Sequence, residues 1–440
     1  MSTHPTATAS SPDLDQRPAV TVLTSFSEAA AATVARQLLS ADERLLVVGH
    51  DISAIRAGRV RRTVRGADGL VEDAAVELVH GCVSCTLRED VLPTLARLAG
   101  QHPAHGIVLV LPTVVEPEAV AAACAHCLVD GAPVTDVVRF DSYVTVVDAA
   151  SLLDDLASTD DLRDRRLHAA DDDYRAVAEV VVRQIEYADT VVSWERSGGP
   201  FERARLSALL YRLAPWARHL KIGAKHDTGP QDTGQHGDLA AALLRTGRHD
   251  PAAPGPLGRA LEGFPIAVHA PDSDSDSDSD CGVVSVLFET RRPFHPQRLH
   301  DALEDLTEDL LRGRGQLWIA SQPDAVVGFE FAGGGVAMGS LGYWLAALPA
   351  DRWGEASDYR RIAADLNWDP YYGDRRTALA FVGLRVDATA ITDLLTACLL
   401  TDDEIADGFD RWRDLPDPFA GCFPLDDDTA PAHSTTVEPS

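Results

Sequence analysis

The sequence predicts a doubly wound α/β domain followed by a smaller α+β domain, and three observations carry this prediction. Short, wholly apolar strands alternate with helical segments over the first half of the chain, which is typical of a parallel sheet buried on both faces. An acidic tract, SDSDSDSD at residues 273–280, then interrupts the pattern. Beyond it, strands and amphipathic helices return. With 440 residues the chain is long enough for two hydrophobic cores.

The first domain is expected to span residues 18–217. A strand at 19–24, a helix at 27–39 and a second strand at 45–48 open it. Later strands are expected at residues 75–78, 107–111, 143–147 and 190–192, with helices that include 91–98 and 117–128. Most of these strands are short and predominantly apolar, so they are expected to be buried on both faces.

A composition rich in Gly, His, Asp and Pro predicts a linker at residues 218–281, where the like charges of the acidic tract prevent packing. The second domain is expected to span residues 282–423. Its helix at 296–311 carries leucines at helical spacing, and its strands are expected to form an antiparallel-rich sheet with helices on one face. Disordered tails are expected at residues 1–17 and 424–440.

The bulk composition limits the function. A formal net charge of −29 argues against nucleic acid or an anionic membrane as the main partner, because both require a basic face. The first residues lack the features of a signal peptide, and no apolar run is long enough to span a membrane. We therefore expect a cytoplasmic protein, in which the seven cysteines are free thiols or metal ligands.

Several motifs resemble those of the CobW family of P-loop GTPases, which act as metal chaperones. ELVHGCVSCTLREDVLPTL at residues 77–95 resembles the metal-motif region of that family, and YVTVVDAASLL at 143–153 resembles a strand on the guanine side. More specific similarities follow in the second domain, at residues 292–299, 315–324, 368–376 and 399–404. The resemblance covers about residues 18–423 and implies a P-loop-NTPase-like domain followed by a CobW C-terminal domain.

The phosphate loop of this family is degenerate here. The corresponding segment, residues 25–33, reads SFSEAAAAT. A working loop needs glycines for close backbone approach, a Lys for the phosphates and a hydroxyl for Mg²⁺. The glycine positions are Ser25, Glu28 and Ala30, the Lys position is Ala31, and the hydroxyl position is Ala32. These five cofactor-binding positions are predicted to be non-functional.

The other nucleotide motifs are lost as well. The segment VLPTVVEP at residues 110–117 lacks the Walker-B acid, and WERS at residues 194–197 replaces the guanine-reading NKxD. The only lysines, Lys221 and Lys225, lie in the expected linker and cannot substitute locally. We predict a pseudo-GTPase without catalytic residues, for which GTP and Mg²⁺ are not cofactors. A GTP-dependent enzyme with an unconventional phosphate site is the alternative.

Cys82 and Cys85 form a CxxC pair at the metal motif. Such spacing lets two thiolates converge on one tetrahedral ion, and thiolate with imidazole suits Zn²⁺. His80 is a candidate third ligand, and His50 and Asp51, at the end of the second strand, are also expected to be within reach. The alternatives are two thiols retained by packing, or a redox pair.

A second pair, Cys124 and Cys127 with His126 between them, is expected on one face of a helix. Packing as small apolar groups is the favoured interpretation of these cysteines, and an auxiliary metal site is the alternative.

The predicted function is zinc handling: the protein binds Zn²⁺ at Cys82 and Cys85 and buffers it, delivers it or regulates an active relative. The expected partner is a client metalloprotein or an active CobW paralogue, docked by the C-terminal domain, and a homo-oligomer is compatible with the sequence. A metal-free interaction module is the remaining alternative.

Overall fold

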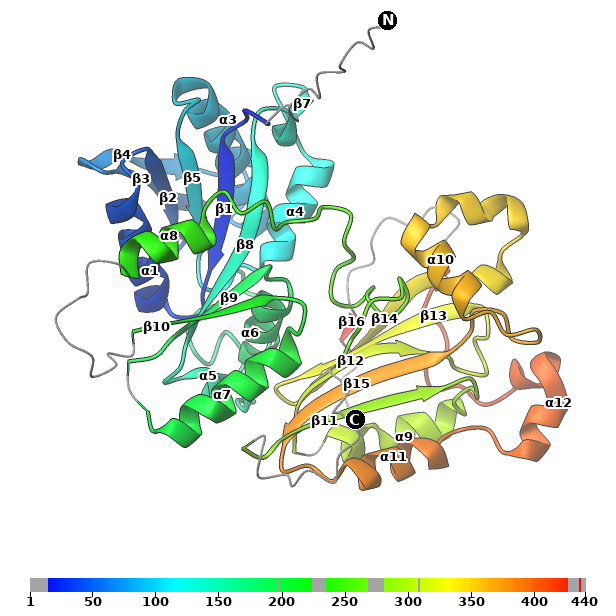
Figure 1. Cartoon of the computed structure of the whole chain (residues 1–440). Helices are drawn as coiled ribbons and strands as arrows, with labels where there is room; N and C mark the ends of the chain where they lie inside the picture. Colours follow the sequence, from blue (N-terminus) through cyan, green and yellow to red (C-terminus); the bar gives the residue numbers. More distant parts are fainter. Residues whose placement is uncertain are drawn as a thin grey trace, which may run out of the picture.

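The structure is a computed structural model of the whole chain, and it describes residues 15–196, 198–223, 235–267, 281–307, 309–425 and 435–436. Two domains of unequal size lie side by side (Figure 1), and the predicted fold class is confirmed. The acidic tract and most of the two expected tails lie outside the described residues.

An eight-stranded sheet forms the centre of the first domain, in the order β10-β9-β8-β1-β5-β2-β3-β4. The six strands from β10 to β2 are parallel, and the β3–β4 hairpin extends the sheet in antiparallel fashion. The strands are β1 (Ala19–Thr24), β2 (Leu45–Asp51), β3 (Arg59–Gly66), β4 (Gly69–Glu77), β5 (Gly106–Val110), β8 (Arg139–Asp148), β9 (Thr190–Trp194) and β10 (Arg218–Ile222).

Helices cover both faces of this sheet. α1 (Glu28–Ala41) and α8 (Gln235–Leu243) pack on one face, against side chains that include Leu23 of β1. α3 (Leu92–Gln101) and α4 (Pro117–His126) pack on the other face, against Val20 and Val22. β1 is buried along its whole length, which explains its continuous apolar run.

Two further helices, α6 (Val177–Glu186) and α7 (Pro200–Leu213), belong to a third apolar cluster that reaches the second domain. The smaller elements of the first domain are η1 (Ile55–Ala57), α2 (Val83–Thr86), η2 (Leu87–Val91), β6 (Leu128–Val129), β7 (Ala132–Pro133), η3 (Val134–Asp136) and α5 (Leu152–Leu156).

The second domain is built on an antiparallel sheet in the order β11-β15-β12-β13-β14-β16. α9 (Pro296–Thr307) and α11 (Ala388–Ala397) pack on one face, as predicted (Figure 1). The strands are β11 (Val283–Thr290), β12 (Leu310–Leu317), β13 (Ala325–Ala332), β14 (Gly335–Tyr343), β15 (Thr377–Leu384) and β16 (Thr435–Thr436). The remaining elements are η4 (Leu345–Ala347), η5 (Ala350–Glu355), α10 (Asp358–Leu366) and α12 (Asp402–Trp412).

The other face of the second sheet packs on α6 and α7 of the first domain. Buried charges cross this interface. Arg312 donates to Glu186 at 2.8 and 2.7 Å and to Glu330 at 2.7 Å, and Arg314 also donates to Glu186. Arg183 of α6 completes the group by donating to Glu330 at 2.7 Å. Each charge is satisfied by a partner, as burial requires.

The structure corrects two boundaries. The helix expected at residues 296–311 ends at Thr307, and Leu310 and Leu311 begin strand β12. Leu310 and Leu311 continue the helical leucine spacing by coincidence. The strand itself was not predicted because its arginines are polar, although every residue of β12 is buried. The first domain also extends beyond residue 217, because β10 and α8 belong to its sheet and helical layer.

The strand expected at residues 75–78 is the end of β4, in the antiparallel hairpin rather than in the parallel part of the sheet. In the part of the chain that the structure describes, no helix is both long and apolar enough to cross a lipid bilayer.

Candidate functional site

The connection from β1 to α1, where a phosphate loop would lie, consists of only three residues, Ser25 to Ser27. Ser27 caps the helix by accepting a hydrogen bond from the Ala30 amide at 3.4 Å, and its own amide donates to Ser25 Oγ at 3.1 Å. Two amides at this helix start, those of Ser27 and Ala30, are therefore satisfied by serine hydroxyls. Of the five degenerate positions, Ser25, Ala30 and Ala31 are buried, whereas Glu28 and Ala32 are exposed on the helix.

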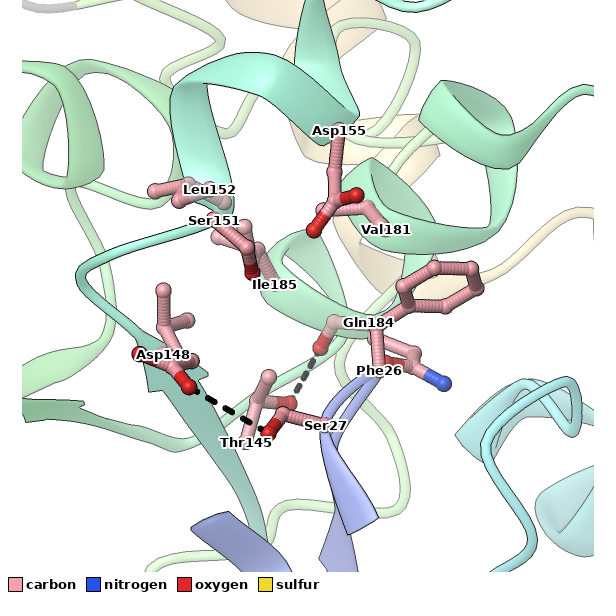
Figure 2. A pocket seen from close by; sticks show the side chains of 11 residues that line it. Phe26, Ser27, Thr145, Asp148, Ser151, Leu152, Asp155, Val181, Gln184 and Ile185 are labelled. Atoms are coloured by element: carbon pink, nitrogen blue, oxygen red, sulfur yellow. Dashed lines mark hydrogen bonds between the residues drawn. The ribbon is translucent and has the colours of Figure 1, made fainter. Parts of the chain in front are cut away.

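The space beside this connection is small. A cavity of about 20 Å³ is lined by Ser27, Asp148, Asp155 and Gln184 among others (Figure 2). Ser27 Oγ lies 3.4 Å from Asp148 Oδ2, which closes one side (Figure 2). One water molecule fits such a volume, whereas small-molecule sites are typically about 300–1,000 Å³.

The end of β9, where guanine would be read, is occupied by the protein's own side chains. Arg196 donates to Asp148 at 2.8 Å, and its guanidinium lies 4.2 Å from the centre of the Trp194 ring. Asp148 thus contacts both Ser27 of the β1–α1 connection and Arg196, which follows β9. Ser197, the last residue of that motif, lies outside the described residues. The residues that are present do not fit a guanine nucleotide with Mg²⁺.

The CxxC loop has a different local structure. Gly81 packs so closely that a Cβ at this position would lie 2.1 Å from the backbone oxygen of Ile55. Cys82 follows as the cap of α2, and its Sγ accepts a hydrogen bond from the Cys85 amide at 3.3 Å. Cys82 is partly exposed and Cys85 is buried. The turn therefore brings the two cysteines together, as their spacing predicted.

Polar groups surround the sulfur of Cys85. The Nδ1 atom of His80 lies 3.9 Å from it, and Arg88 donates to it at 3.6 Å. Burial raises the pKa of the Cys85 thiol, and the neighbouring Cys82 raises it further. Glu89 receives the Val79 amide at 2.9 Å and the Arg88 guanidinium at 2.8 Å, which fixes the start of the loop to its end.

The other two expected ligands are not gathered here. Asp51 is exposed and accepts a hydrogen bond from the Ser53 amide at 2.8 Å, which lowers the pKa of its carboxyl group. His50 is buried, and its Nε2 atom lies 2.7 Å from Asp90 Oδ2. Within the described residues, no three His, Cys, Asp or Glu side chains form a group that holds a metal ion. The structure thus places Cys82, Cys85 and His80 in proximity and leaves Asp51 apart.

Sequence reasoning missed the anchor of the loop. After α2 the chain forms a π-helical turn, η2, which places Asp90 between His50 and Arg62. A π-turn often marks a functional segment. The pairing joins positions 40 residues apart, and no sequence motif signals it.

The second cysteine pair lies at the end of α4. Cys124 packs into the apolar cluster of α3 and α4, and burial raises the pKa of its thiol to about 12. Cys127 follows the helix as its cap and lies within electrostatic range of Arg88. Packing is the interpretation that the environment of Cys124 favours.

Comparison with known families gives two matches. The CobW/HypB/UreG nucleotide-binding domain matches residues 19–193, and the cobalamin synthesis protein cobW C-terminal domain matches residues 283–399. Together they span most of both described domains.

The chain belongs to the CobW family.

Among CobW relatives, the zinc chaperone Rv0106 of Mycobacterium tuberculosis is 36% identical over 385 residues, which cover 85% of this chain and 86% of that protein. The zinc-regulated GTPase metalloprotein activator 1 of Dictyostelium discoideum is 28% identical over 421 residues, 91% of this chain and 83% of that protein. The Zn(II)-bound YjiA GTPase from E. coli aligns over 87% of this chain and 99% of its own, at 15% identity and a TM-score of 0.36. This TM-score is too low to support a conclusion about the fold.

Proposed function

We propose that this CobW-family protein is a zinc metallochaperone or zinc buffer that works without GTP hydrolysis. Zinc is its cargo, held by Cys82 and Cys85 with His80 nearby, and a client metalloprotein or an active CobW paralogue receives it. The short, internally capped β1–α1 connection carries the proposal, because serine hydroxyls accept its Ser27 and Ala30 amides and the cavity beside it, of about 20 Å³, is far too small for a triphosphate.

The composition of the cysteine site supports a transfer role. Structural zinc sites are closed by four protein ligands. Here the two cysteines lie together with His80 Nδ1 3.9 Å from Cys85 Sγ, and the described residues form no group of three ligands, so positions on an ion held by the thiols remain for ligands of a receiving protein. Cys82 is partly exposed, which gives such ligands access. The names of two relatives, a zinc chaperone and a zinc-regulated metalloprotein activator, favour the same metal.

Zinc stoichiometry and affinity, measured with and without GTP and Mg²⁺, test this proposal. We expect about one zinc per chain in both conditions, and no saturable binding of GTP at micromolar concentrations. The Cys82→Ser/Cys85→Ser variant is expected to lose at least 100-fold in zinc affinity, since both thiolates are removed.

Cys422→Ser is the matched control, because Cys422 is a partly buried thiol of the second domain. Equal zinc content in the double variant and the wild type would reject the site. Mg²⁺-dependent GTP binding in the low micromolar range would reject the pseudo-GTPase proposal.

A further inference from the structure

A larger cavity lies between the two domains, away from the cysteine loop. Its volume is about 200 Å³, compared with about 20 Å³ at the former nucleotide site. Glu118 of α4 and Arg183 of α6 line it from the first domain, and Glu330 of β13 lines it from the second. This volume is far larger than a single water molecule requires.

The charges around this cavity are unequal. Arg183 contacts Glu330 at 2.7 Å and Glu179 at 3.2 Å, so its guanidinium is already paired. Arg312 is paired with Glu186 and Glu330 in the same way. Glu118 has neither a hydrogen bond nor an ion pair with any described residue.

The position of Glu118 has an electrostatic consequence. Burial raises the pKa of its carboxyl group to about 7; Arg183 opposes this rise, and Glu330 and Glu116 add to it. At pH 8 the Glu118 carboxyl group is therefore largely ionised, while the guanidinium of Arg183, which lines the same cavity, is already paired with Glu330 and Glu179.

The remaining walls are mostly apolar, with Ser340 as a further polar residue. Pro256 and Leu257 close the cavity from the segment that joins the domains, and Met338 and Leu341 close it from β14. Gly339 leaves open space, because a Cβ at this position would meet nothing within 4 Å. A ligand that fits carries one positive charge and a short aliphatic body.

We propose that this interdomain cavity binds an aliphatic ammonium ion, with the ammonium group on Glu118 and the alkyl chain against Leu257, Met338 and Leu341. An ammonium group supplies three donors to a carboxylate that has none. A free aliphatic amine and the lysine side chain of a partner protein share this chemistry. The proposal does not depend on zinc binding.

Ligand-observed NMR on the full chain at pH 8 tests it, with n-butylamine as the probe and butan-1-ol as its neutral counterpart. For so small a probe we expect a dissociation constant on the order of 1 mM. Glu118→Gln keeps the shape of the cavity and removes its charge, and it is expected to weaken n-butylamine at least tenfold. Glu43→Gln, at an exposed position, is the control and is expected to change nothing.

Binding is also expected to weaken below pH 7, as the Glu118 carboxyl group takes up a proton. The other charged groups that face it are Glu116, Glu179, Arg183, Glu186, Arg312 and Glu330. Equal binding of butan-1-ol and n-butylamine, or unchanged binding to the Glu118→Gln variant, would overturn the proposal.

A second probe distinguishes the two sources. Nα-acetyl-lysine-N-methylamide carries the same aminobutyl group on a peptide backbone. Tighter binding of this probe than of n-butylamine supports a partner's lysine, and weaker binding supports a free amine. Absence of binding by both probes contradicts the proposal.

Discussion

Two helices of the first domain begin with a side chain that accepts a hydrogen bond from the helix's own backbone. At α1 the cap is the hydroxyl of Ser27, and at α2 it is the sulfur of Cys82. A hydroxyl is a good cap and a poor ligand for zinc, whereas a thiolate is a weak cap and a strong zinc ligand. The same local structure therefore engages a hydroxyl at one helix start and a potential metal ligand at the other, which is the basis of the proposed loss of nucleotide binding and retention of zinc binding.

The largest difference between the two helix starts is expected in the unfolding free energy lost when the aspartate beside each of them, Asp90 or Asp148, is replaced. Asp90, behind α2, is buried between Arg62 and His50, so Asp90→Ala leaves both without this partner and costs about 3–5 kcal/mol of unfolding free energy. Chemical denaturation measures the loss. Asp148→Ala, beside α1, is the comparison, because its partner Arg196 is half exposed and the expected loss is about 1 kcal/mol. Equal losses would remove the distinction between the anchors.

Gly81→Ala is expected to disturb the cysteine loop next most strongly. The added methyl group would lie 2.1 Å from the Ile55 carbonyl oxygen, so the turn must shift at a cost of about 2–3 kcal/mol. Thermal unfolding and zinc titration measure the two effects. Gly100→Ala is the matched control: its Cβ meets nothing in α3, and we expect a gain of about 0.5 kcal/mol. An unshifted melting temperature for Gly81→Ala would contradict the close packing.

Zinc affinity is expected to depend on pH through the thiols at the start of α2 and not through the Ser27 hydroxyl at the start of α1. The pKa of Cys85 is raised by burial and by Cys82, so its thiol is protonated at neutral pH and zinc must displace the proton. Affinity therefore rises with pH, by up to about tenfold per unit for each proton released, from pH 6.5 to 8. Competition with a chelating indicator measures this slope. Cys85→Ser is expected to reduce the slope by one proton, and an unchanged slope would argue against Cys85 as a ligand.

The smallest effect is expected at the hydroxyl cap. Ser27→Ala removes the hydrogen bond to the Ala30 amide and is expected to cost about 1 kcal/mol, with no change in zinc affinity. Ser27→Asn, which retains a capping oxygen, is expected to recover most of the stability. Denaturation and zinc titration on the same samples check both statements. A zinc affinity that falls with Ser27→Ala would mean that the two helix starts are coupled.

Much of the fold was predictable because its signals are local. β1 and β5 are continuous apolar runs, and α9 shows helical leucine spacing, so each could be placed from the sequence. β12 could not, because its arginines are buried only through pairing with Glu186 and Glu330 from distant segments. β10 could not be predicted for a similar reason. It joins the sheet by pairing with β9, and α7 separates these two strands in the sequence.

The candidate site divides in the same way. Cys82 and Cys85 are brought together by a turn of four residues, which the spacing predicts. The hydrogen-bond partner of His50 is Asp90, which lies 40 positions away in a π-helical turn. Asp51 follows His50 but points to solvent on the opposite face of the strand. Proximity in the sequence therefore predicted that the two cysteines lie together, but it did not predict the partners of the strand-end residues.

Glu186 lies at the junction of the two domains, held by two arginines where water has no access. Separating the second sheet from α6 would leave three buried ions, Glu186, Arg312 and Arg314, without these partners, at a cost of several kcal/mol each. Separation of the two domains is therefore expected to be energetically costly. Under the proposed function, zinc at the cysteine loop is therefore transferred across the outer surface, where Cys82 is partly exposed, and not through an opening between the domains.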